Sequence, residues 1–511
     1  MTNHSANNKR IARNTIILYI RMLVVMGVTL FTSRIVLQAL GVEDFGLYNV
    51  VGGVVGLFTF LRTSMEKCTQ RFLNVEMAKK NGRLNEIFCM SMSIHITIMI
   101  FALLLAETVG LWFLNSAINI PDGREFAANI VYQSTLFSLC CTILSVPYSA
   151  CVISHEKMSF YALISVLDAF MKLAIAYMAW NSSADNLIIY GILMACISFV
   201  EFLMYVFYCK KEFIEAKYRI FFDKTLFKDM LGFAGWNLVG QATVLGVNQG
   251  NSILVNIFHS VTANAAMTVG NQVNNAVVAL SANFQTAFNP QITKSYASND
   301  ISYMRSLLYG TSKLSFLLLI IITLPIFFNI DFILSLWLKT VPTYSSIFCI
   351  LSLCCGIINA LSTPLNFCIM ATGDIKWSQI MTALVYLSDI VVLYALFSLG
   401  LPPATAMSVK IAVVSLVLLV RLYYVHKAIP EFDIKDYTAH VILPLVLFSI
   451  ICLLMGFILY STESRNLISD IFSAFVLFFI SITCAYYIVL NKLERNTINE
   501  QIKKIIKLKK K

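Results

Sequence analysis

Fourteen long apolar stretches dominate the sequence and constrain the fold more than any other feature. Each is roughly 20 residues or longer, the length that an α-helix needs to cross the hydrocarbon core of a bilayer. Unpaired backbone groups are too costly in lipid, so such stretches must be helices or the strands of a closed barrel. Barrel strands are segments of about ten residues in which apolar and polar residues alternate. These longer, continuously apolar stretches therefore predict helices. The stretches lie near 14–40, 45–62, 87–113, 127–149, 159–180, 187–208, 229–257, 263–288, 307–337, 345–371, 378–399, 403–426, 438–460 and 467–490.

The composition agrees with an all-α polytopic membrane protein. Hydrophobic residues make up 58% of the chain and charged residues 13%, whereas soluble domains carry about 45–50% and about 25%. These values exclude a soluble enzyme, a disordered chain and a disulfide-rich secreted fold. The 13 cysteines are scattered without a Cys-x-x-Cys pair, so we interpret them as apolar packing residues and expect no metal site.

The distribution of lysine and arginine predicts the orientation in the membrane. With a cytoplasmic N-terminus, 30 basic residues fall in inside segments and three, Arg124, Lys339 and Arg465, fall in outside loops. This bias follows the positive-inside rule, and the even number of spans places both termini in the cytoplasm. We interpret the first stretch as a retained signal anchor. The basic tail Lys503–Lys511 either lies on the anionic inner leaflet or is solvated.

Five basic residues lie within the apolar stretches: Arg21, Arg34, Lys172, Lys313 and Lys410. A charge facing lipid at mid-span is costly, so each must reach the interface, pair, or face water. Lys313 can reach the inner interface along its own helix. Arg34, near the outer end of the first stretch, can likewise reach the outer interface or face an anion path, and Arg21, Lys172 and Lys410 are the other candidates for a path that attracts an anion.

Three acidic residues are also buried in the predicted spans. Asp168 stands four residues before Lys172, which permits an ion pair on one helical face. Glu201 and Asp389 are, with Asp168, candidates for coupling to protons or cations, because low dielectric favours a protonated carboxyl group. The alternative is that these acids simply neutralise the basic residues.

Polar side chains form stripes on two consecutive stretches, 229–257 and 263–288. Spacings of 3, 4 or 7 residues place them on one face of each helix: Asn237, Gln241, Asn248 and Ser252, then Asn264, Thr268, Asn271 and Asn275. Amides donate and accept hydrogen bonds together, which suits a ligand rich in hydroxyl groups such as a sugar. We favour a hydrated cavity wall, while helix-to-helix bonding by the amides is the alternative.

A weak internal repeat predicts the domain organisation. Residues 34–72 can be laid over 252–291 with a shift of 218–219, which equals six spans. A six-span shift preserves orientation, as in transporters that bind substrate between two parallel halves. The prediction is an N-lobe at 1–208, a C-lobe at 209–428 with a basic linker at 210–228, two further spans within 429–490, and a basic tail at 491–511.

Two segments resemble Wzx-type polysaccharide flippases of the MOP superfamily, which also contains MATE drug exporters and lipid II flippases. One is Asn14…Arg21…Thr32-Ser33-Arg34…Leu40-Gly41-Val42-Glu43-Asp44-Phe45-Gly46-Leu47-Tyr48. The other is Asn264-Ala265-Ala266…Gln272-Val273…Asn289-Pro290-Gln291-Ile292-Thr293-Lys294-Ser295-Tyr296-Ala297. The resemblance extends over nearly the whole chain, and the span count agrees with it.

The resemblance implies two six-helix lobes around a cationic lumen, with alternating access. Such proteins flip undecaprenyl-pyrophosphate-linked oligosaccharide across the bacterial inner membrane for O-antigen, lipopolysaccharide, capsule or exopolysaccharide synthesis. It implies no enzymatic activity and no cofactor, with coupling to H⁺, Na⁺ or the membrane potential. Expected partners are the lipid-linked oligosaccharide, membrane lipids, and a glycan polymerase with glycosyltransferases, and nucleic acid is not expected. The anion contacts of the family map onto Arg21, Lys172, Arg34 and Lys410.

Two other functions compete with this interpretation. A cation-coupled multidrug antiporter is expected to have an acidic, aromatic cavity, whereas this chain is more basic and amide-rich. A membrane glycan polymerase or ligase generally needs a long outer loop for its catalytic groups, and no predicted outer loop exceeds about fifteen residues. No GxxxxGK[ST] phosphate-binding loop is present either.

Overall fold

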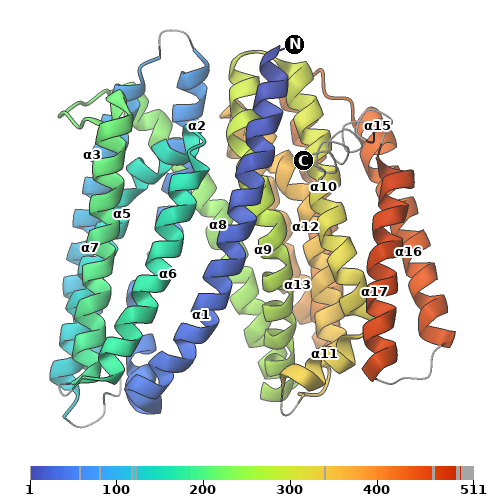
Figure 1. Ribbon diagram of the computed structural model, residues 1–511, viewed down its shortest axis with the longest axis horizontal. Coiled ribbons are helices and arrows are strands. Elements are labelled where there is room, and N and C mark those ends of the chain that lie inside the picture. Colours follow the sequence, from blue (N-terminus) through green and yellow to red (C-terminus); the bar gives the residue numbers. More distant parts are fainter. Residues whose placement is uncertain are drawn as a thin grey trace, which may run out of the picture. The chain divides into compact units, whose positions relative to one another are not determined.

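The computed structural model describes residues 2–56, 59–79, 82–116, 120, 123–182, 185–338, 341–462, 467–490 and 495. The described part is almost entirely helical and contains no strand, which confirms the all-α prediction (Figure 1). The basic tail Lys503–Lys511, Lys339 and Arg465 lie outside the described residues. The helices up to the linker are α1 (Thr2–Gly56), α2 (Thr59–Ala78), α3 (Leu84–Leu105), η1 (Ala106–Gly110), α4 (Leu111–Ser116), α5 (Glu125–Ser154), α6 (Met158–Trp180), α7 (Asn186–Glu212) and η2 (Ile214–Ala216).

After the linker come α8 (Lys224–Phe258), α9 (Val261–Ala297), α10 (Ile301–Phe328), α11 (Ile330–Trp337), α12 (Ser345–Thr372), α13 (Lys376–Ser398), α14 (Thr405–Ala428), α15 (Ile434–Tyr437), η3 (Thr438–Ile442), α16 (Leu443–Thr462), α17 (Leu467–Cys484) and η4 (Ala485–Val489). Among the described residues, 12 segments are long and apolar enough to cross a membrane. Two of the fourteen predicted spans, 45–62 and 263–288, are not among them. The second lies in α9, whose many amides lower its hydropathy although the helix has 37 residues.

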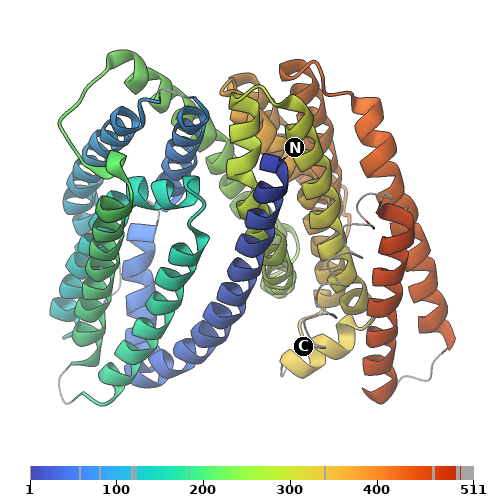
Figure 2. The same cartoon turned by 45° about the horizontal axis from the view of Figure 1, so that its top comes forward.

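The chain forms two compact units. Unit 1 comprises Met1–Ala242, Thr286–Asp300 and Gly373–Lys376, and unit 2 comprises Thr243–Gln285, Ile301–Thr372 and Trp377–Lys511. In unit 1, α1 packs on α6, and α5 packs on α7. In unit 2, α12 packs on α10 and α14, and the last two long helices, α16 and α17, lie beside α10 (Figures 1 and 2). The predicted lobe boundaries stay a prediction.

Helix α1 is interrupted at Gly41, which has φ 73° and ψ 176°. This backbone conformation is essentially restricted to glycine, because any Cβ would clash with the neighbouring peptide groups. With the shift of 218–219 in the internal repeat, Gly41 aligns with His259 or Ser260, which lie between the end of α8 and the start of α9. The break therefore falls at the same place in both copies of the predicted repeat.

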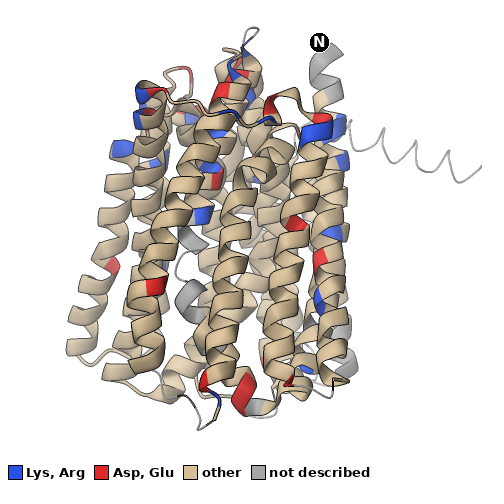
Figure 3. Ribbon diagram, turned by 90° about the vertical axis from the view of Figure 1, so that its left-hand side faces the viewer, with Lys and Arg blue, Asp and Glu red and all other residues tan. Residues whose placement is uncertain are grey.

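Ionic contacts tie the helices together at the end of unit 1 that holds Gly41. Arg124, just before α5, forms ion pairs with Asp44 and Asp185. Asp185 also caps α7 by accepting hydrogen bonds from the backbone N–H of Leu187 (3.0 Å) and Ile188 (3.3 Å). One of the three basic residues predicted outside thus has a structural role. Most other lysine and arginine residues of unit 1 gather at the opposite end (Figure 3), which we call the basic end.

Candidate functional site

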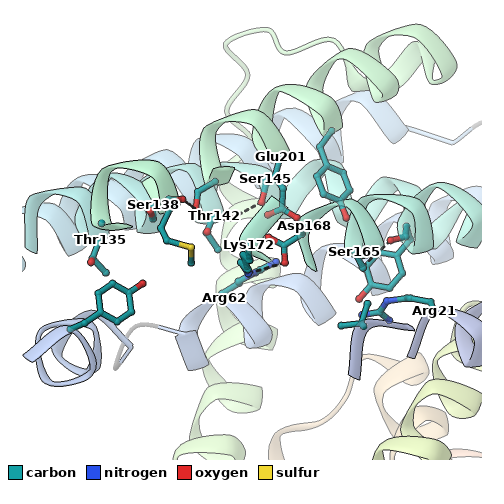
Figure 4. A pocket seen from close by; sticks show the side chains of 17 residues that line it. Arg21, Arg62, Thr135, Ser138, Thr142, Ser145, Ser165, Asp168, Lys172 and Glu201 are labelled. Atoms are coloured by element: carbon teal, nitrogen blue, oxygen red, sulfur yellow. Dashed lines mark hydrogen bonds and ion pairs between the residues drawn. The ribbon is translucent and has the colours of Figure 1, made fainter. Parts of the chain in front are cut away.

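A polar cavity of about 390 Å³ lies inside unit 1, between α1, α2, α5, α6 and α7 (Figure 4). Its size falls within the range of ligand-binding sites, roughly 300–1,000 Å³. The middle of α5 lines the cavity, while the two ends of α5 pack in separate apolar cores. Three basic and two acidic side chains line it: Arg21, Arg62, Lys172, Asp168 and Glu201. Charged groups at membrane depth generally mark a ligand or ion pathway.

Lys172 and Asp168 form the ion pair that their spacing predicts, with 2.8 Å between Nζ and Oδ2. The Lys172 side chain is 40% exposed and that of Asp168 is 21% exposed. The pair therefore reaches the cavity instead of being sealed in the protein core. Among the described residues, the other carboxylate oxygen of Asp168 has no hydrogen-bond partner. An anionic ligand in the cavity can compete with Asp168 for the ammonium group.

The two arginines approach the cavity from different helices. The Arg21 guanidinium group of α1 lies 4.7 Å from the centre of the Tyr161 ring on α6, a cation–π distance that orients its N–H groups. Arg62 projects from the first turn of α2 and lies near the Lys172–Asp168 pair, with Arg21 further along the cavity beside Ser165 (Figure 4). Guanidinium groups bind phosphate through two parallel hydrogen bonds, which suits them to a pyrophosphate.

A stripe of hydroxyl groups on α5 completes the cavity wall. Thr135, Ser138, Thr142 and Ser145 line it at spacings of 3, 4 and 3 residues. Three of these hydroxyls donate to backbone carbonyls of their own helix: Thr135 to Val131 (2.7 Å), Ser138 to Ser134 (3.0 Å) and Ser145 to Thr142 (2.8 Å). Because their protons are engaged, these hydroxyls present acceptor lone pairs to the cavity.

A second cavity of about 540 Å³ lies inside unit 2, between α8, α9, α12, α13 and α14. Amide side chains dominate its polar lining, at six positions: Asn248, Gln249, Asn271, Asn274, Asn275 and Asn359. Each amide offers both a donor and an acceptor, so the wall can satisfy ligands with many hydroxyl groups. An apolar ligand would instead leave these groups without partners, at a cost of about 1–3 kcal/mol for each buried one.

Two charged residues of this second cavity have amide partners. Lys410 donates to Asn248 Oδ1 at 2.8 Å, and Asp389, which has no exposed surface, accepts from Asn251 Nδ2 at 3.2 Å. Within the described part of the chain, neither charge has an ion-pair partner. The neutral partners leave the charge of Lys410 available to an anionic group of a ligand.

The structure places the eight residues of the predicted polar wall in different surroundings. Asn248, Asn271 and Asn275 line the unit 2 cavity. Ser252 donates to Asn264 Oδ1 at 2.8 Å, and Thr268 donates to the Asn264 backbone carbonyl at 2.9 Å, so both contact Asn264. Asn237 is 4% exposed and donates to Ser64, and Gln241 lines neither cavity.

For Asn237, the alternative that the amides make helix-to-helix contacts fits better, because a buried amide bonded to a serine is closed to a ligand.

Of the four candidate anion contacts, Arg21 and Lys172 line the unit 1 cavity and Lys410 lines the unit 2 cavity. Arg34 is exposed on α1 and lines neither. Of the three candidate coupling acids, Asp168 and Glu201 line the first cavity and Asp389 lines the second.

Sequence reasoning missed several cavity residues. Arg62 was expected in an inside segment, since it ends the apolar stretch 45–62, yet it lines the cavity. The spacing of the α5 hydroxyl residues by three and four predicts that they share one face of a helix, and this pattern could have identified them from the sequence. Asn274 and Asn359 also line the second cavity, and Asn359 stands in a stretch without a polar stripe to mark it.

Apart from the two cavities, a cluster of buried polar contacts surrounds Glu156, in the turn between α5 and α6. Its side chain has no exposed surface and its φ is 57°. Arg10 Nε lies 2.7 Å from one carboxylate oxygen, and Lys294 Nζ (2.9 Å) and Gln291 Nε2 (2.6 Å) contact the other. Asn14 donates to the Glu156 backbone carbonyl at 3.3 Å. Asn14, Gln291 and Lys294 all belong to the segments that resemble polysaccharide flippases.

Burial lowers the pKa of Lys294, and the charge of Glu156 opposes this shift. The carboxylate thus helps to keep the lysine protonated inside the protein. Together the contacts fix the last turns of α9 to the α5–α6 turn and to the start of α1. In the described part of the chain, no cluster of three His, Cys, Asp or Glu residues is arranged to hold a metal ion.

Comparisons with known proteins agree on the fold. Residues 238–395 match the family model MatE. A structure described as MATE in complex with MaD3S has a TM-score of 0.71 at 9% identity, covering 83% of this chain and 97% of that one. An outward-facing multidrug resistance MATE family transporter of the MOP superfamily gives 0.69 at 13% identity, covering 84% and 97%.

A MOP superfamily transporter from Pyrococcus furiosus gives a TM-score of 0.69 at 12% identity, covering 83% of this chain and 96% of that one. Its description states that the reverse polarity of its binding pocket suggests a different function. No curated protein sequence matches the chain. At these identities the solved structures show that this chain has the fold of MATE transporters.

Proposed function

We propose that the protein is an alternating-access flippase that moves a polyprenyl-pyrophosphate-linked oligosaccharide across the membrane. The observation that carries the proposal is the unit 1 cavity, in which Arg21, Arg62 and Lys172 outnumber Asp168 and Glu201. Inside the membrane a pyrophosphate loses the water that solvates its negative charge, so basic side chains must compensate that charge. The fold shared with MATE transporters supports transport as the general activity.

Each part of the substrate has a chemically matched partner. The guanidinium groups of Arg21 and Arg62 bind phosphate oxygens, while Lys172 leaves Asp168 to join them. The amides of the unit 2 cavity match the hydroxyl groups of a glycan, and Asn248, Asn271 and Asn275 among them belong to the predicted wall. The polyprenyl tail stays in lipid, where burial of its methylene groups costs nothing.

The acids of the two cavities supply a means of coupling. Once Lys172 engages the substrate, Asp168 loses its ion-pair partner while Glu201 shares the same cavity, and proton uptake there relieves the repulsion between the two carboxylates. Release of the substrate restores the Lys172–Asp168 pair and expels the proton. Asp389 in unit 2 is a second candidate for this role, since it has no exposed surface.

A cation-coupled multidrug antiporter is the second candidate function. Asp168, Glu201 and Tyr161 in the unit 1 cavity favour it, because carboxylates and aromatic rings bind organic cations. The basic residues of the same cavity oppose it, since an organic cation would meet Arg21, Arg62 and Lys172.

A deletion strain distinguishes the two functions. The flippase proposal predicts that lipid-linked oligosaccharide accumulates on the inner leaflet and surface glycan is lost, while susceptibility to cationic drugs is unchanged. Increased drug susceptibility with normal surface glycan would favour the antiporter and exclude the flippase.

A further inference from the structure

The segment that joins α7 to α8, residues 213–223, lies at the basic end of unit 1 (Figure 2). Three of its large apolar side chains are highly exposed. The exposed fraction is 88% for Ile214, 93% for Ile220 and 67% for Phe222. Side chains of this kind are not left in water without a compensating contact when they gather in one short segment.

The segment is fixed in place by the first turns of α3. Asn85 Nδ2 donates to the backbone carbonyls of Glu215 and Lys217, both at 2.8 Å. The backbone N–H of Arg219 donates to Cys89 Sγ at 3.3 Å. The apolar stretch of α3 begins near residue 87, so these contacts hold the segment at the level where that helix enters the membrane.

Exposed apolar and basic residues alternate along the sequence after Ala216, where Tyr218, Ile220 and Phe222 follow or flank Lys217 and Arg219. The apolar set is 41%, 93% and 67% exposed. Exposed apolar side chains next to basic side chains suit the boundary of a leaflet, where the apolar groups contact acyl chains and the cations contact headgroups.

The nearby acids do not cancel this basic charge. Glu212 pairs with Lys157 at 3.2 Å, and Asp223 accepts from the backbone N–H of Thr225 at 2.9 Å. Glu215 contacts His155, whose hydrogen bond keeps the pKa of Glu215 low although burial opposes this shift. The exposed basic side chains of residues 210–228 are Lys210, Lys211, Lys217, Arg219, Lys224 and Lys228.

We propose that residues 213–223 are an interfacial anchor that inserts Ile214, Ile220 and Phe222 into the leaflet and binds anionic lipid headgroups through Lys217 and Arg219. The partner is the lipid surface of the leaflet predicted to face the cytoplasm. Each basic side chain close to an anionic surface favours it about fivefold, equivalent to ~1 kcal/mol. This contact does not depend on which substrate the protein carries.

Photo-crosslinking of the full-length protein tests the anchor. The crosslinking amino acid p-benzoylphenylalanine replaces Ile220, or Phe126 as a control, which is 73% exposed at the opposite end of unit 1. Vesicles contain phosphatidylcholine with the anionic lipid phosphatidylglycerol, and mass spectrometry identifies the adducts. We expect lipid adducts at both positions, with phosphatidylglycerol enriched severalfold over its bulk fraction at position 220 and not at position 126.

The variant Lys217→Gln/Arg219→Gln separates headgroup binding from apolar insertion. We expect it to retain the lipid adduct at position 220 while the enrichment falls to the bulk ratio, as added salt should also cause. Lipid adducts at position 126 with none at 220 would overturn the anchor. Adducts at position 220 without enrichment in the parent protein would overturn the anionic selectivity. In isolated native membranes, an adduct to a protein in place of lipid would contradict the proposed partner.

Discussion

Two carboxylates of unit 1 bind basic side chains in different surroundings. The Glu156 side chain has no exposed surface and contacts both Arg10 and Lys294, whereas Asp168 is 21% exposed and pairs with Lys172 at a cavity. Removing one member of a buried pair leaves a charge without compensation, while a solvated pair contributes little to stability. We therefore expect Glu156 to matter for folding and Asp168 to matter for ligand binding.

The substitution Glu156→Gln should destabilise the protein. It removes the countercharge of Lys294, whose side chain is 22% exposed, and we expect a loss of about 3 kcal/mol, the low end for a broken buried pair. Thermal unfolding in detergent measures the effect. The matched control is Glu212→Gln, which breaks a pair with exposed fractions of 48% and 38% and should change little. Equal unfolding temperatures for the two variants would contradict the structural role of Glu156.

Asp168→Asn should bind pyrophosphate more tightly than the parent protein. The substitution frees Lys172 from its partner, so affinity should rise up to about fivefold, since a partly exposed pair is worth at most ~1 kcal/mol. Lys172→Gln should weaken binding, because it removes a cation from the cavity. Calorimetry with inorganic pyrophosphate and the purified protein measures both. Unchanged affinity in both variants would show that this pair does not contact the anion.

At the scale of the element, α1 combines a long helix with a break that one residue permits. Gly41 has φ 73° and ψ 176°, and apart from its own neighbours in the chain an added Cβ would meet no atom within 4 Å. The requirement for glycine there is therefore one of backbone conformation, not of space. Gly27 lies in the helical part of the same element, and nothing lies within 4 Å of its Cβ position either.

Gly41→Ala should destabilise the protein by about 2 kcal/mol, the typical cost of a backbone conformation that other residues rarely adopt. Gly27→Ala should be neutral or stabilising by about 0.5–1 kcal/mol, because alanine favours a helix over glycine. Thermal unfolding of both variants makes the comparison. If Gly27→Ala were the more damaging variant, the break at Gly41 would not be needed for the fold.

For the whole molecule, hydropathy alone predicts the class of fold, because a membrane segment must be both apolar and internally hydrogen-bonded. A strict hydropathy criterion is weakest where a helix lines a polar cavity: the predicted span 263–288 is helical throughout in α9, but with amides such as Asn271 and Asn275 it is not among the 12 most clearly apolar segments of the described residues. The site is less predictable, because helical spacing shows which residues share a face without showing what that face contacts. Arg62 illustrates this limit, since its place at the end of an apolar stretch suggested a loop instead of a cavity.

In the proposed function, the unit 1 cavity binds the pyrophosphate of a lipid-linked oligosaccharide. The most direct test of this binding is translocation of that substrate in proteoliposomes by Arg21→Glu, Arg62→Glu and Arg34→Glu, with thermal unfolding as a check on folding. Arg34 is the matched control, because it is exposed on the same helix as Arg21 and lines neither cavity. We predict that the two cavity variants fold but lose at least about tenfold in rate, equivalent to ~1.4 kcal/mol, and that Arg34→Glu retains activity. Normal translocation by the folded cavity variants would contradict the account.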